Sequence, residues 1–540
     1  PLFGLGLGLA LCSSAVVLVR FIVMRDVLQE QPGANLQGTG AGLLAALVIG
    51  IVVFVLTRAI GKVFYYEGIP RPATWGLAVF PIPIFALLTT AGDDALPRAA
   101  PEAKPLNGRG TVLVVVDTLR ADALGIYGAA EHDGAPVTPN LDAFSERGVV
   151  FDDVTAQASW TRPAVASLLT SRHVSGHQTM RKSAILPDSL VTVAEAMQSS
   201  GKKTAAVVTN YNLEAGYGFA QGFDQYRYLA PARYLGAPER ANRLAAYNVY
   251  RVIREKLITA GREARFFYRD GQVVNAVGME MLDTIGNEEF FLYLHYMEPH
   301  DPYFGKERSF ARVAQVHPPA ALKDEMLAAY RDEVRRFDQV FGELLTALEA
   351  RGLRDRVDIV VTADHGEEFM DHGGWWHGET LYQEQIHIPL IAAGPSFAPS
   401  RVSDIARQID IAPTLAAAAG VSAPDSWEGR DLMDASLVVD VAIAEENHNG
   451  NELTAIRKGS IKLLNANPNN PRGVPEQEAF DLATDPGEQA ALPESKVPLS
   501  TLSDLLEQGL KSASEGSAVA EERDLTPEQE AELRALGYVQ

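Results

Sequence analysis

Residues 111–117 read Thr111-Val-Leu-Val-Val-Val-Asp117, an uninterrupted apolar run that ends in a carboxylate. Such a run is typical of a strand that is buried on both faces of a parallel sheet. Residues 290–296 and 357–362 have the same character, and a helical pattern rich in Ala, Leu, Glu and Arg occupies 322–351. Alternating strands and helices predict an α/β fold, in which helices flank a mostly parallel central sheet.

Polar side chains that could bind a metal follow two of these strands. Asp117 and Asp364 come just after the strands, and His365 is next in the chain. Ligands bind to parallel sheets beyond the carboxyl ends of the strands. Carboxylate and imidazole groups suit a divalent cation such as Ca²⁺, Mn²⁺, Zn²⁺ or Mg²⁺. We therefore expect a metal site at this edge.

Histidines are concentrated after the same strand. Four of the eleven lie between residues 365 and 387, namely His365, His372, His377 and His387. Isolated histidines usually have structural roles, and chance clustering on a surface loop is an alternative. A dense His/Asp/Gly loop after a buried strand favours a functional site instead.

Three apolar stretches precede the α/β region, at residues 1–19, 41–57 and 73–91. Each is close to the length of about 20 residues that crosses a bilayer, so we expect three membrane helices. Arg58, Lys62 and Arg71 make the second loop the more basic, which predicts that it is cytoplasmic. An odd number of crossings then places the rest of the chain outside the cytoplasm, in a periplasmic or extracellular position. The sequence begins at Pro1 rather than Met, and we expect further residues to precede it.

The composition argues against nucleic-acid binding and against cysteine-based sites. The net charge of −22 argues against non-specific binding to nucleic acid. Cys12 is the only cysteine, which excludes an intramolecular disulfide and a thiolate metal cluster.

The expected domain order follows from these patterns. It comprises a transmembrane region at 1–91, a Pro/Ala/Gly-rich linker at 92–110, a catalytic domain at 111–430 and a C-terminal subdomain at 431–540. A terminal helix is expected to begin near Thr526, with Pro527 in its first turn.

Four segments together resemble the sulfatase family of the alkaline-phosphatase-like superfamily, in order and at plausible separations. They are residues 116–122 (VDTLRAD), 159–171 (SWTRPAVASLLTS), 295–303 (HYMEPHDPY) and 362–378 (TADHGEEFMDHGGWWHG). Residues 480–488 (FDLATDPGE) and 533–539 look like sulfatase C-terminal elements, so the resemblance covers about 110–540. It implies metal ligands at Asp117, Asp364 and His365, and substrate contacts from His300 and His377.

The nucleophile segment departs from the family pattern. Typical sulfatases have Cys-x-Pro-Ser-Arg, whose cysteine becomes formylglycine, whereas this chain has Thr161 two places before Pro163. Ala164-Val165 replace the Ser-Arg pair, and Cys12 lies in the membrane region. Formylglycine chemistry is therefore not expected. Lipoteichoic acid synthases and phosphoethanolamine transferases resemble this arrangement, with threonine as nucleophile.

Thr161 is accordingly expected to attack the ester and to be an additional metal ligand. Its alternative role is to N-cap the following helix. Thr118 stands where many sulfatases have a second Asp, which leaves room for one cation with fewer ligands. Other candidates stay open. Arg162 can bind the anion or face solvent. His372 can be a further ligand, whereas His387 is more typical of a structural residue. His173 and His177 either line the site or lie outside it.

Three functions compete. The first is a phosphoester hydrolase or phosphotransferase that uses Thr161, and the second is a sulfuric ester hydrolase without formylglycine. The third is an inactive membrane scaffold, which the retention of clustered, costly polar groups disfavours. The expected substrate is an anionic ester, such as one in a lipid or a cell-envelope glycan.

Overall fold

The computed structural model describes residues 100–231, 268–304, 309–312, 316–437 and 439–523, which belong to one structural unit of the chain, Leu96–Pro231 with Glu263–Gln540. The three apolar stretches, linker residues 92–99 and the helix expected after Thr526 lie outside these residues. Among the helices that are described, none is both long and apolar enough to cross a membrane.

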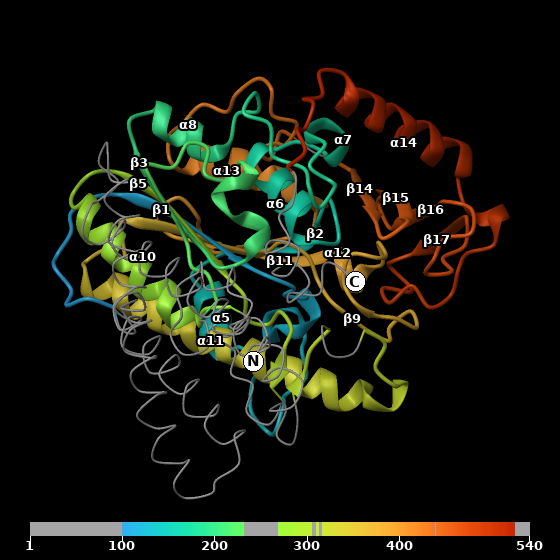
Figure 1. Ribbon diagram of the computed structural model, residues 1–540, viewed down its shortest axis with the longest axis horizontal. Helices are drawn as coiled ribbons and strands as arrows, with labels where there is room; N and C mark the ends of the chain where they lie inside the picture. Colours follow the sequence, from blue (N-terminus) through green and yellow to red (C-terminus); the bar gives the residue numbers. More distant parts are fainter. Residues whose placement is uncertain (1–99, 232–267, 305–308, 313–315, 438, 524–540) are drawn as a thin grey trace, which may run out of the picture. The chain divides into compact units, whose positions relative to one another are not determined.

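A nine-stranded sheet forms the centre of this unit (Figure 1). Along the sheet the strands run in the order β12 (Ser400–Val402), β2 (Gly148–Thr155), β11 (His387–Ala393), β8 (Val357–Ala363), β1 (Gly110–Val116), β5 (Phe290–Tyr296), β3 (Lys203–Val208) and β4 (Gln225–Tyr228), and β13 (Ala406–Arg407) also pairs with β2. Only the pairings of β11 are antiparallel within this described sheet. The expected mostly parallel sheet is confirmed.

Helices cover both faces of the sheet (Figure 1). On one side lie α5 (Pro139–Ser145), α10 (Gly271–Ile285) and α11 (Lys323–Ala350), and on the other lie α6 (Thr161–Thr170), α8 (Val193–Ser199) and α13 (Ile411–Ala418). Shorter elements are α7 (Val174–His177), α12 (Gln383–Ile386), and the ribbons β6 (Tyr303–Phe304) with β7 (Ser309–Phe310) and β9 (Glu368–Phe369) with β10 (Trp375–Trp376).

The expected strands and the long helix agree closely with the structure. The strand before Asp117 starts at Gly110, the strand before Asp364 extends to Ala363, and the strand at 290–296 has the expected ends. Residues 111–116 are all buried, which explains their apolar composition. The long helix begins at Lys323, because residues 320–322 form a 3₁₀ turn.

A second, antiparallel sheet follows near the C-terminus. Its strands are β14 (Val441–His448), β15 (Asn451–Lys458), β16 (Ile461–Ala466) and β17 (Gln477–Asp481), and α14 (Leu499–Ser514) packs its Leu502 and Leu506 against them. Asn449 and Gly450 form the β14–β15 turn with φ of 53° and 83°. Positive φ at both positions is what a two-residue type I′ hairpin requires, and Asn-Gly supplies it at low cost.

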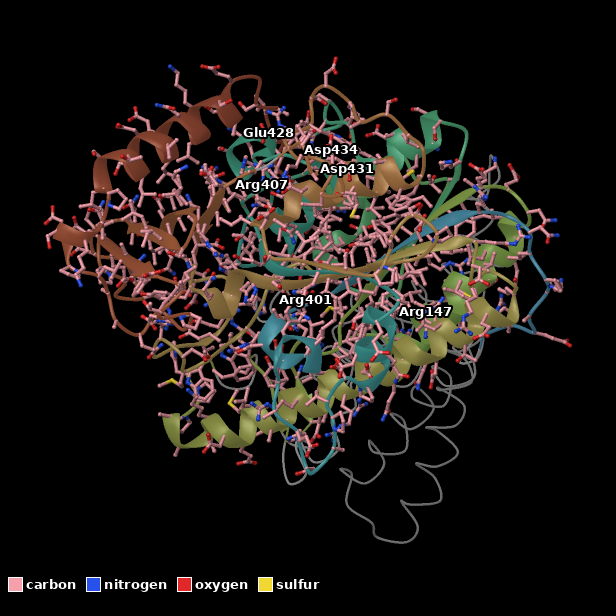
Figure 2. All side chains as sticks on the ribbon, turned by 180° about the vertical axis from the view of Figure 1, so that it is seen from behind. Arg147, Arg401, Arg407, Glu428, Asp431 and Asp434 are labelled. Carbon is pink, nitrogen blue, oxygen red and sulfur yellow. The ribbon has the colours of Figure 1, made fainter. Side chains whose placement is uncertain are left out.

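One edge of the central sheet is charged. Arg401 on β12 donates from Nε to Asp152 of β2 at 2.5 Å, on the face shown in Figure 2. A short, charged edge strand discourages pairing with other chains.

Candidate active site

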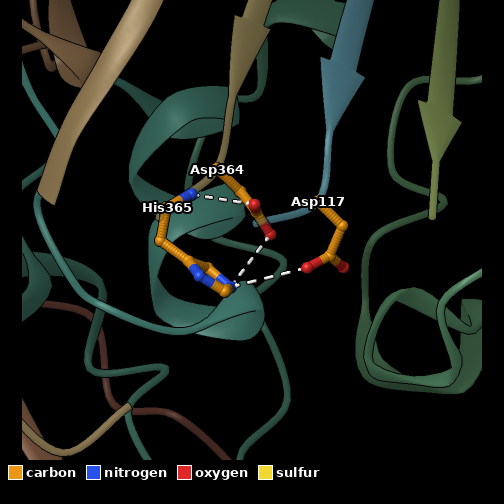
Figure 3. Close-up of side chains that lie close together, drawn as sticks. All are labelled: Asp117, Asp364 and His365. Atoms are coloured by element: carbon orange, nitrogen blue, oxygen red, sulfur yellow. Dashed lines mark hydrogen bonds and ion pairs between the residues drawn. The ribbon is translucent and has the colours of Figure 1, made fainter. Parts of the chain in front are cut away.

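The metal-ligand candidates meet because two adjacent strands end together. β1 and β8 are parallel neighbours with Val116 paired to Ala363, so the residues that follow them emerge side by side. Ligand atoms of Asp117, Asp364 and His365 all lie within 4.8 Å of one another (Figure 3). His365 Nε2 is 3.4 Å from Asp364 Oδ2 and 3.7 Å from Asp117 Oδ1, and all three residues are buried.

Two carboxylate oxygens at this point fit a cation. Asp364 Oδ1 accepts from the backbone N–H groups of Thr118 (3.2 Å) and His365 (2.8 Å). Asp364 Oδ2 and Asp117 Oδ1 are buried and have no hydrogen-bond partner among the described residues. Buried acceptor oxygens without a partner are costly, and a divalent cation would satisfy them.

The pKa shifts show two buried carboxyl groups without enough compensating positive charge, which a cation would supply. Burial, and the charge of Asp364, raise the pKa of Asp117 to about 6, and burial raises the pKa of Asp364 to about 7. Burial lowers the pKa of His365 to about 4, which leaves it as the neutral imidazole that binds metals. His365 Nδ1 lies 2.9 Å from the Gly366 carbonyl, a contact that directs Nε2 toward the carboxylates.

Thr161 is the first residue of α6, and its side chain faces the same cluster. Its Oγ1 is 3.4 Å from Asp117 Oδ2 and 3.4 Å from His365 Nε2. The N-cap of α6 is Trp160, which makes no side-chain capping bond. The capping role considered for Thr161 is therefore wrong.

Asn210 is a member of the cluster that the sequence analysis missed. It follows β3, and its Nδ2 donates to Asp117 Oδ2 (2.7 Å) and to Thr161 Oγ1 (3.3 Å). Its Oδ1 accepts from the Asn212 N–H at 2.9 Å, which fixes the orientation of the amide. The apolar run Thr204–Val208 before it carries the same strand-end signal that identified Asp117.

His300 and His377 complete the buried set. The His377 ring lies 4.6 Å from the ring of His365 and 5.0 Å from that of His300, between centroids. Burial and the nearby histidines hold the pKa of His377 well below its usual range. Burial opposes the charged form of His300, but Asp117 and two other carboxylates outweigh burial and raise its pKa.

Glu367 was also missed by the sequence analysis. Its Oε1 is 3.0 Å from His377 Nδ1, and its Oε2 accepts a hydrogen bond from Tyr303. Burial raises the pKa of Glu367 to about 8. It lies within the quoted segment 362–378, but nothing local distinguishes it from Glu368, which pairs with Arg472 at 2.8 Å.

The open alternatives for Arg162 and for the histidines near α6 can now be compared with the structure. Arg162 is buried, donates to the Arg181 carbonyl (3.2 Å) and to Asn212 (3.1 Å), and stacks on Tyr217, so the solvent-facing alternative is wrong. The ring nitrogens of His177 contact Ser167 (3.0 Å) and the Thr179 N–H (3.0 Å) rather than the cluster. His173 is a buried residue at the N-cap of α7.

Two histidines of the 365–387 group make contacts outside the cluster around Asp117. His372 lies 2.8 Å from Glu384 and 3.0 Å from the Glu488 carbonyl, and it stacks on Tyr382. His387 Nε2 is 3.1 Å from the Asp152 carbonyl. Neither belongs to the set of ligand atoms around Asp117.

The C-terminal sheet touches the segment that carries Thr161. Glu446 Oε2 accepts from the Ser159 hydroxyl (2.6 Å) and the Ser159 N–H (3.2 Å), and His448 stacks on Trp160 with ring centroids 5.0 Å apart. Both contacts join residues nearly three hundred positions apart in the sequence, so no local pattern predicts them.

An α/β sheet with Asp, His and Thr side chains gathered at the carboxyl ends of its strands has the form of a candidate hydrolytic site, and the family match places the chain in the alkaline-phosphatase-like superfamily. The chain belongs to the sulfatase family, whose family model matches residues 109–421, more than half of the sequence. The resemblance to sulfatases inferred from the motifs is confirmed.

The individual relatives share limited sequence identity with this chain or match only a part of it. Human arylsulfatase A is 27% identical over 386 residues, covering 63% of this chain and 69% of that protein. Arylsulfatase K of Xenopus laevis is 36% identical over 97 residues, and the match spans only 18% of its length.

Solved structures show the same fold. A 2-O GAG sulfatase superposes with a TM-score of 0.61 at 16% identity, covering 79% of this chain and 96% of that one. A phosphonate monoester hydrolase from Silicibacter pomeroyi superposes with a TM-score of 0.57 at 17% identity, covering 76% and 96%.

Proposed function

We propose that this chain is a metal-dependent enzyme that cleaves or transfers phosphate or sulfate ester groups, with Thr161 as the nucleophile. The observation that carries the proposal is the position of Thr161 Oγ1, 3.4 Å from both Asp117 and His365 at the start of a helix. A helix N-terminus favours the anionic group that would be transferred.

Asp117, Asp364 and His365 would hold the cation, with the Thr161 oxygen as a further ligand. When bound, a divalent cation supplies a lowered pKa for an oxygen nucleophile and polarises the ester. Asn210 donates to the Thr161 oxygen, and the Thr161 O–H points to Asp117 Oδ2. Both contacts orient the hydroxyl, and the one from Asn210 also stabilises negative charge that develops on the Thr161 oxygen.

The reaction has two displacements. The Thr161 hydroxyl passes its proton to Asp117 Oδ2, which accepts its hydrogen bond, and the Thr161 oxygen forms a bond to phosphorus or sulfur. The bond to the leaving alcohol oxygen breaks, and that oxygen takes a proton from a histidine. His300 is the better proton donor, because its pKa is raised while that of His377 is lowered. Water or an acceptor alcohol then gives its proton to His300 and attacks the threonine ester. The bond from the Thr161 oxygen to phosphorus or sulfur breaks, and the proton held by Asp117 returns to restore the Thr161 hydroxyl.

Threonine in the nucleophile position favours phosphate esters. In the family, formylglycine comes from the residue two places before proline, and this chain has Thr161 at that position, with Cys12 as its only cysteine. The runner-up is a sulfuric ester hydrolase without formylglycine, which the family and its arylsulfatase relatives support. An inactive scaffold is disfavoured, because at least six polar side chains are buried together at a cost.

The expected substrate is an anionic ester of a lipid or a cell-envelope glycan. The apolar stretches before residue 92 support a membrane anchor with the catalytic region outside the cytoplasm. Among proteins of similar fold, one has been solved in complex with its substrate D-glucosamine-2-N,6-O-disulfate and another in complex with k-i-k-neocarrahexaose, which supports a sugar ester as substrate.

The test compares Thr161→Ala, Thr161→Ser and Thr170→Ala in the full chain, on matched aryl phosphate and aryl sulfate esters, after chelation and readdition of single metals. Thr170 is the control, because its hydroxyl bonds the Ala166 carbonyl within the same helix. We expect Thr161→Ala to lose roughly a thousandfold or more in kcat, as for other nucleophiles. Thr161→Ser should keep part of the activity, and Thr170→Ala most of it.

Phosphate should turn over faster than sulfate, and mass spectrometry of the quenched reaction should find phosphate on the peptide with Thr161. Full activity of Thr161→Ala would mean that water attacks directly. Faster turnover of the sulfate ester would favour the sulfuric ester hydrolase. Activity that chelation leaves unchanged would argue against metal dependence.

A further inference from the structure

The backbone around His377 is held in a conformation that neighbouring contacts must maintain. Trp376 before it has a φ of 73°, and Gly378 after it has a φ of 85°. The left-handed conformation is costly for a bulky residue such as tryptophan, and it persists only where the surrounding structure enforces it. The contacts of this stretch therefore decide where the His377 ring lies, 4.6 Å from the ring of His365 between centroids.

Two buried side chains bond the peptide unit between His377 and Gly378. The Gly378 N–H donates to Gln385 Oε1 at 3.0 Å. The His377 carbonyl accepts from Arg312 Nη1 at 3.3 Å. Gln385 and Arg312 are 1% and 3% exposed. Because strand β10 ends at Trp376, bonds from side chains orient this peptide unit.

Both of these side chains are linked to Arg472. Gln385 Nε2 donates to Glu368 Oε2 at 3.1 Å. Arg472 Nη2 donates to the two carboxylate oxygens of Glu368, at 3.0 and 2.8 Å, and Glu368 is only 1% exposed. On the other side of the peptide unit, Glu379 lies 3.5 Å from Arg312 and 3.6 Å from Arg472. Two chains of contacts thus run from Arg472 to one peptide unit.

Arg472 belongs to the C-terminal subdomain and not to the loop that it contacts. It lies between β16 and β17, and its N–H donates to Asn451 Oδ1 at the start of β15 (3.1 Å). Its guanidinium lies against the turn of the β9–β10 ribbon, where a Cβ at Gly374 would be 1.8 Å from Arg472 Nη2. Glu368 also accepts from the Gly374 N–H, at 2.7 Å. The ribbon that leads to His377 is therefore folded around a side chain of the C-terminal subdomain.

We propose that Arg472 is a positioning residue of the candidate active site, which sets the place of the His377 ring through the β9–β10 ribbon. The proposal rests on the proposed function, in which His377 contacts the group that is transferred. Without Arg472, Glu368 would be a buried carboxylate that has lost its ion pair, and the ribbon around it would rearrange. The C-terminal subdomain is then required for catalysis as well as for stability.

The simpler alternative is that Arg472 only docks the C-terminal sheet on the central one. Arg457→Met is the matched control, because Arg457 on β15 pairs with Asp153 on β2 and joins the same two sheets. The side chains of Arg472 and Arg457 are 16% and 12% exposed, so losing either ion pair should cost similar stability. The variants under test are Arg472→Met, Arg472→Lys and Gln385→Leu, the last of which cuts one chain of contacts and keeps the ion pair.

The first measurement reads the surroundings of the His377 ring without turnover. The full chain is labelled with ¹³C-histidine, and the ring signal of His377 is assigned by its loss in His377→Asn. We expect Arg472→Met and Gln385→Leu to shift or broaden this signal, and Arg457→Met to leave it unchanged. Arg472→Lys should shift the signal less than Arg472→Met, because it keeps the charge but not the planar fork of donors.

An unchanged His377 signal in Arg472→Met, or an equal shift in Arg457→Met, would overturn the proposal. If Arg472→Met does not fold, an unchanged signal in Gln385→Leu overturns it in the same way.

The second measurement is a double-mutant cycle on kcat. We expect Arg472→Met to lower kcat roughly tenfold or more, as for other partners that orient the residues of a site. The same substitution in the His377→Asn chain should cost nothing further, because its effect passes through that ring. A full additional loss would show that Arg472 acts by another route and would overturn the proposal. Full activity of Thr161→Ala would count against the proposed function alone, since the His377 signal still decides the role of Arg472.

Discussion

Ser159 and Glu446 show how single residues far apart in the chain fix the nucleophile segment. Glu446 is fully buried on β14, and its Oε1 accepts from the Asn447 N–H at 3.0 Å while Oε2 accepts from Ser159. Ser159 stands two residues before Thr161. The position of the nucleophile thus depends on a carboxyl group of the C-terminal sheet.

Glu446 makes stability depend on pH. Burial raises its pKa from 4.5 to about 8, so the folded chain binds a proton that the unfolded chain releases. The stabilisation is complete below the unfolded pKa and is lost as pH rises toward about 8. Glu446→Gln cannot ionise, and we expect its stability relative to the unmodified chain to increase between pH 5 and pH 8, measured as urea midpoints across that range.

Glu452→Gln is the matched control, because Glu452 is exposed on the neighbouring strand β15. Its midpoints should follow those of the unmodified chain at every pH. Parallel profiles for Glu446→Gln as well would show that Glu446 ionises normally in the fold.

At the level of elements, helix α11 holds the turn after β1. Thr118 has a φ of 58°, a strained value for a β-branched residue. The Tyr330 hydroxyl from α11 donates to the Thr118 carbonyl (2.9 Å) and accepts from the Arg120 N–H (2.9 Å). The Thr118 N–H in turn donates to Asp364, so the helix supports the ligand cluster through this turn.

Tyr330→Phe should destabilise the fold by roughly 1–3 kcal/mol, because a buried carbonyl and a buried N–H lose their partner. Tyr293→Phe is the control, since the buried Tyr293 hydroxyl on β5 has no hydrogen-bond partner among the described residues. Urea unfolding should show a lower midpoint for Tyr330→Phe and no decrease for Tyr293→Phe. Equal midpoints for the two variants would mean that the Tyr330 bonds contribute nothing.

At the level of the whole molecule, the expectation that remains to be tested is the membrane topology of the chain. The three apolar stretches predict three crossings within 1–91, and the basic second loop at 58–72 predicts an extracytoplasmic catalytic region. Reporters that are active only outside the cytoplasm, fused within 58–72 or after residue 110, should be silent at the first site and active at the second. The reverse pattern would invert the orientation without changing the chemistry. Cytoplasmic signals at both sites would mean that the stretch at 73–91 does not cross the membrane.

Much of the site was accessible from the sequence because strand ends are a local signal. An apolar run followed by a carboxylate identified Asp117 and Asp364, and the resemblance to the Cys-x-Pro pattern of sulfatases identified Thr161 as the nucleophile candidate. These residues meet because parallel neighbours present their carboxyl ends at one edge. Local composition was sufficient for the fold class, the strands and the long helix.

Tertiary structure alone decided which other polar groups join them. Asn210 and Glu446 reach the nucleophile segment from β3 and β14, whose places depend on strand order and on packing between sheets. His177 and His377 have the same chemistry, yet the first binds Ser167 and the second lies beside His365. Periodicity reports which face of an element is buried, but the partner of a buried polar atom is set by contacts between residues distant in the chain.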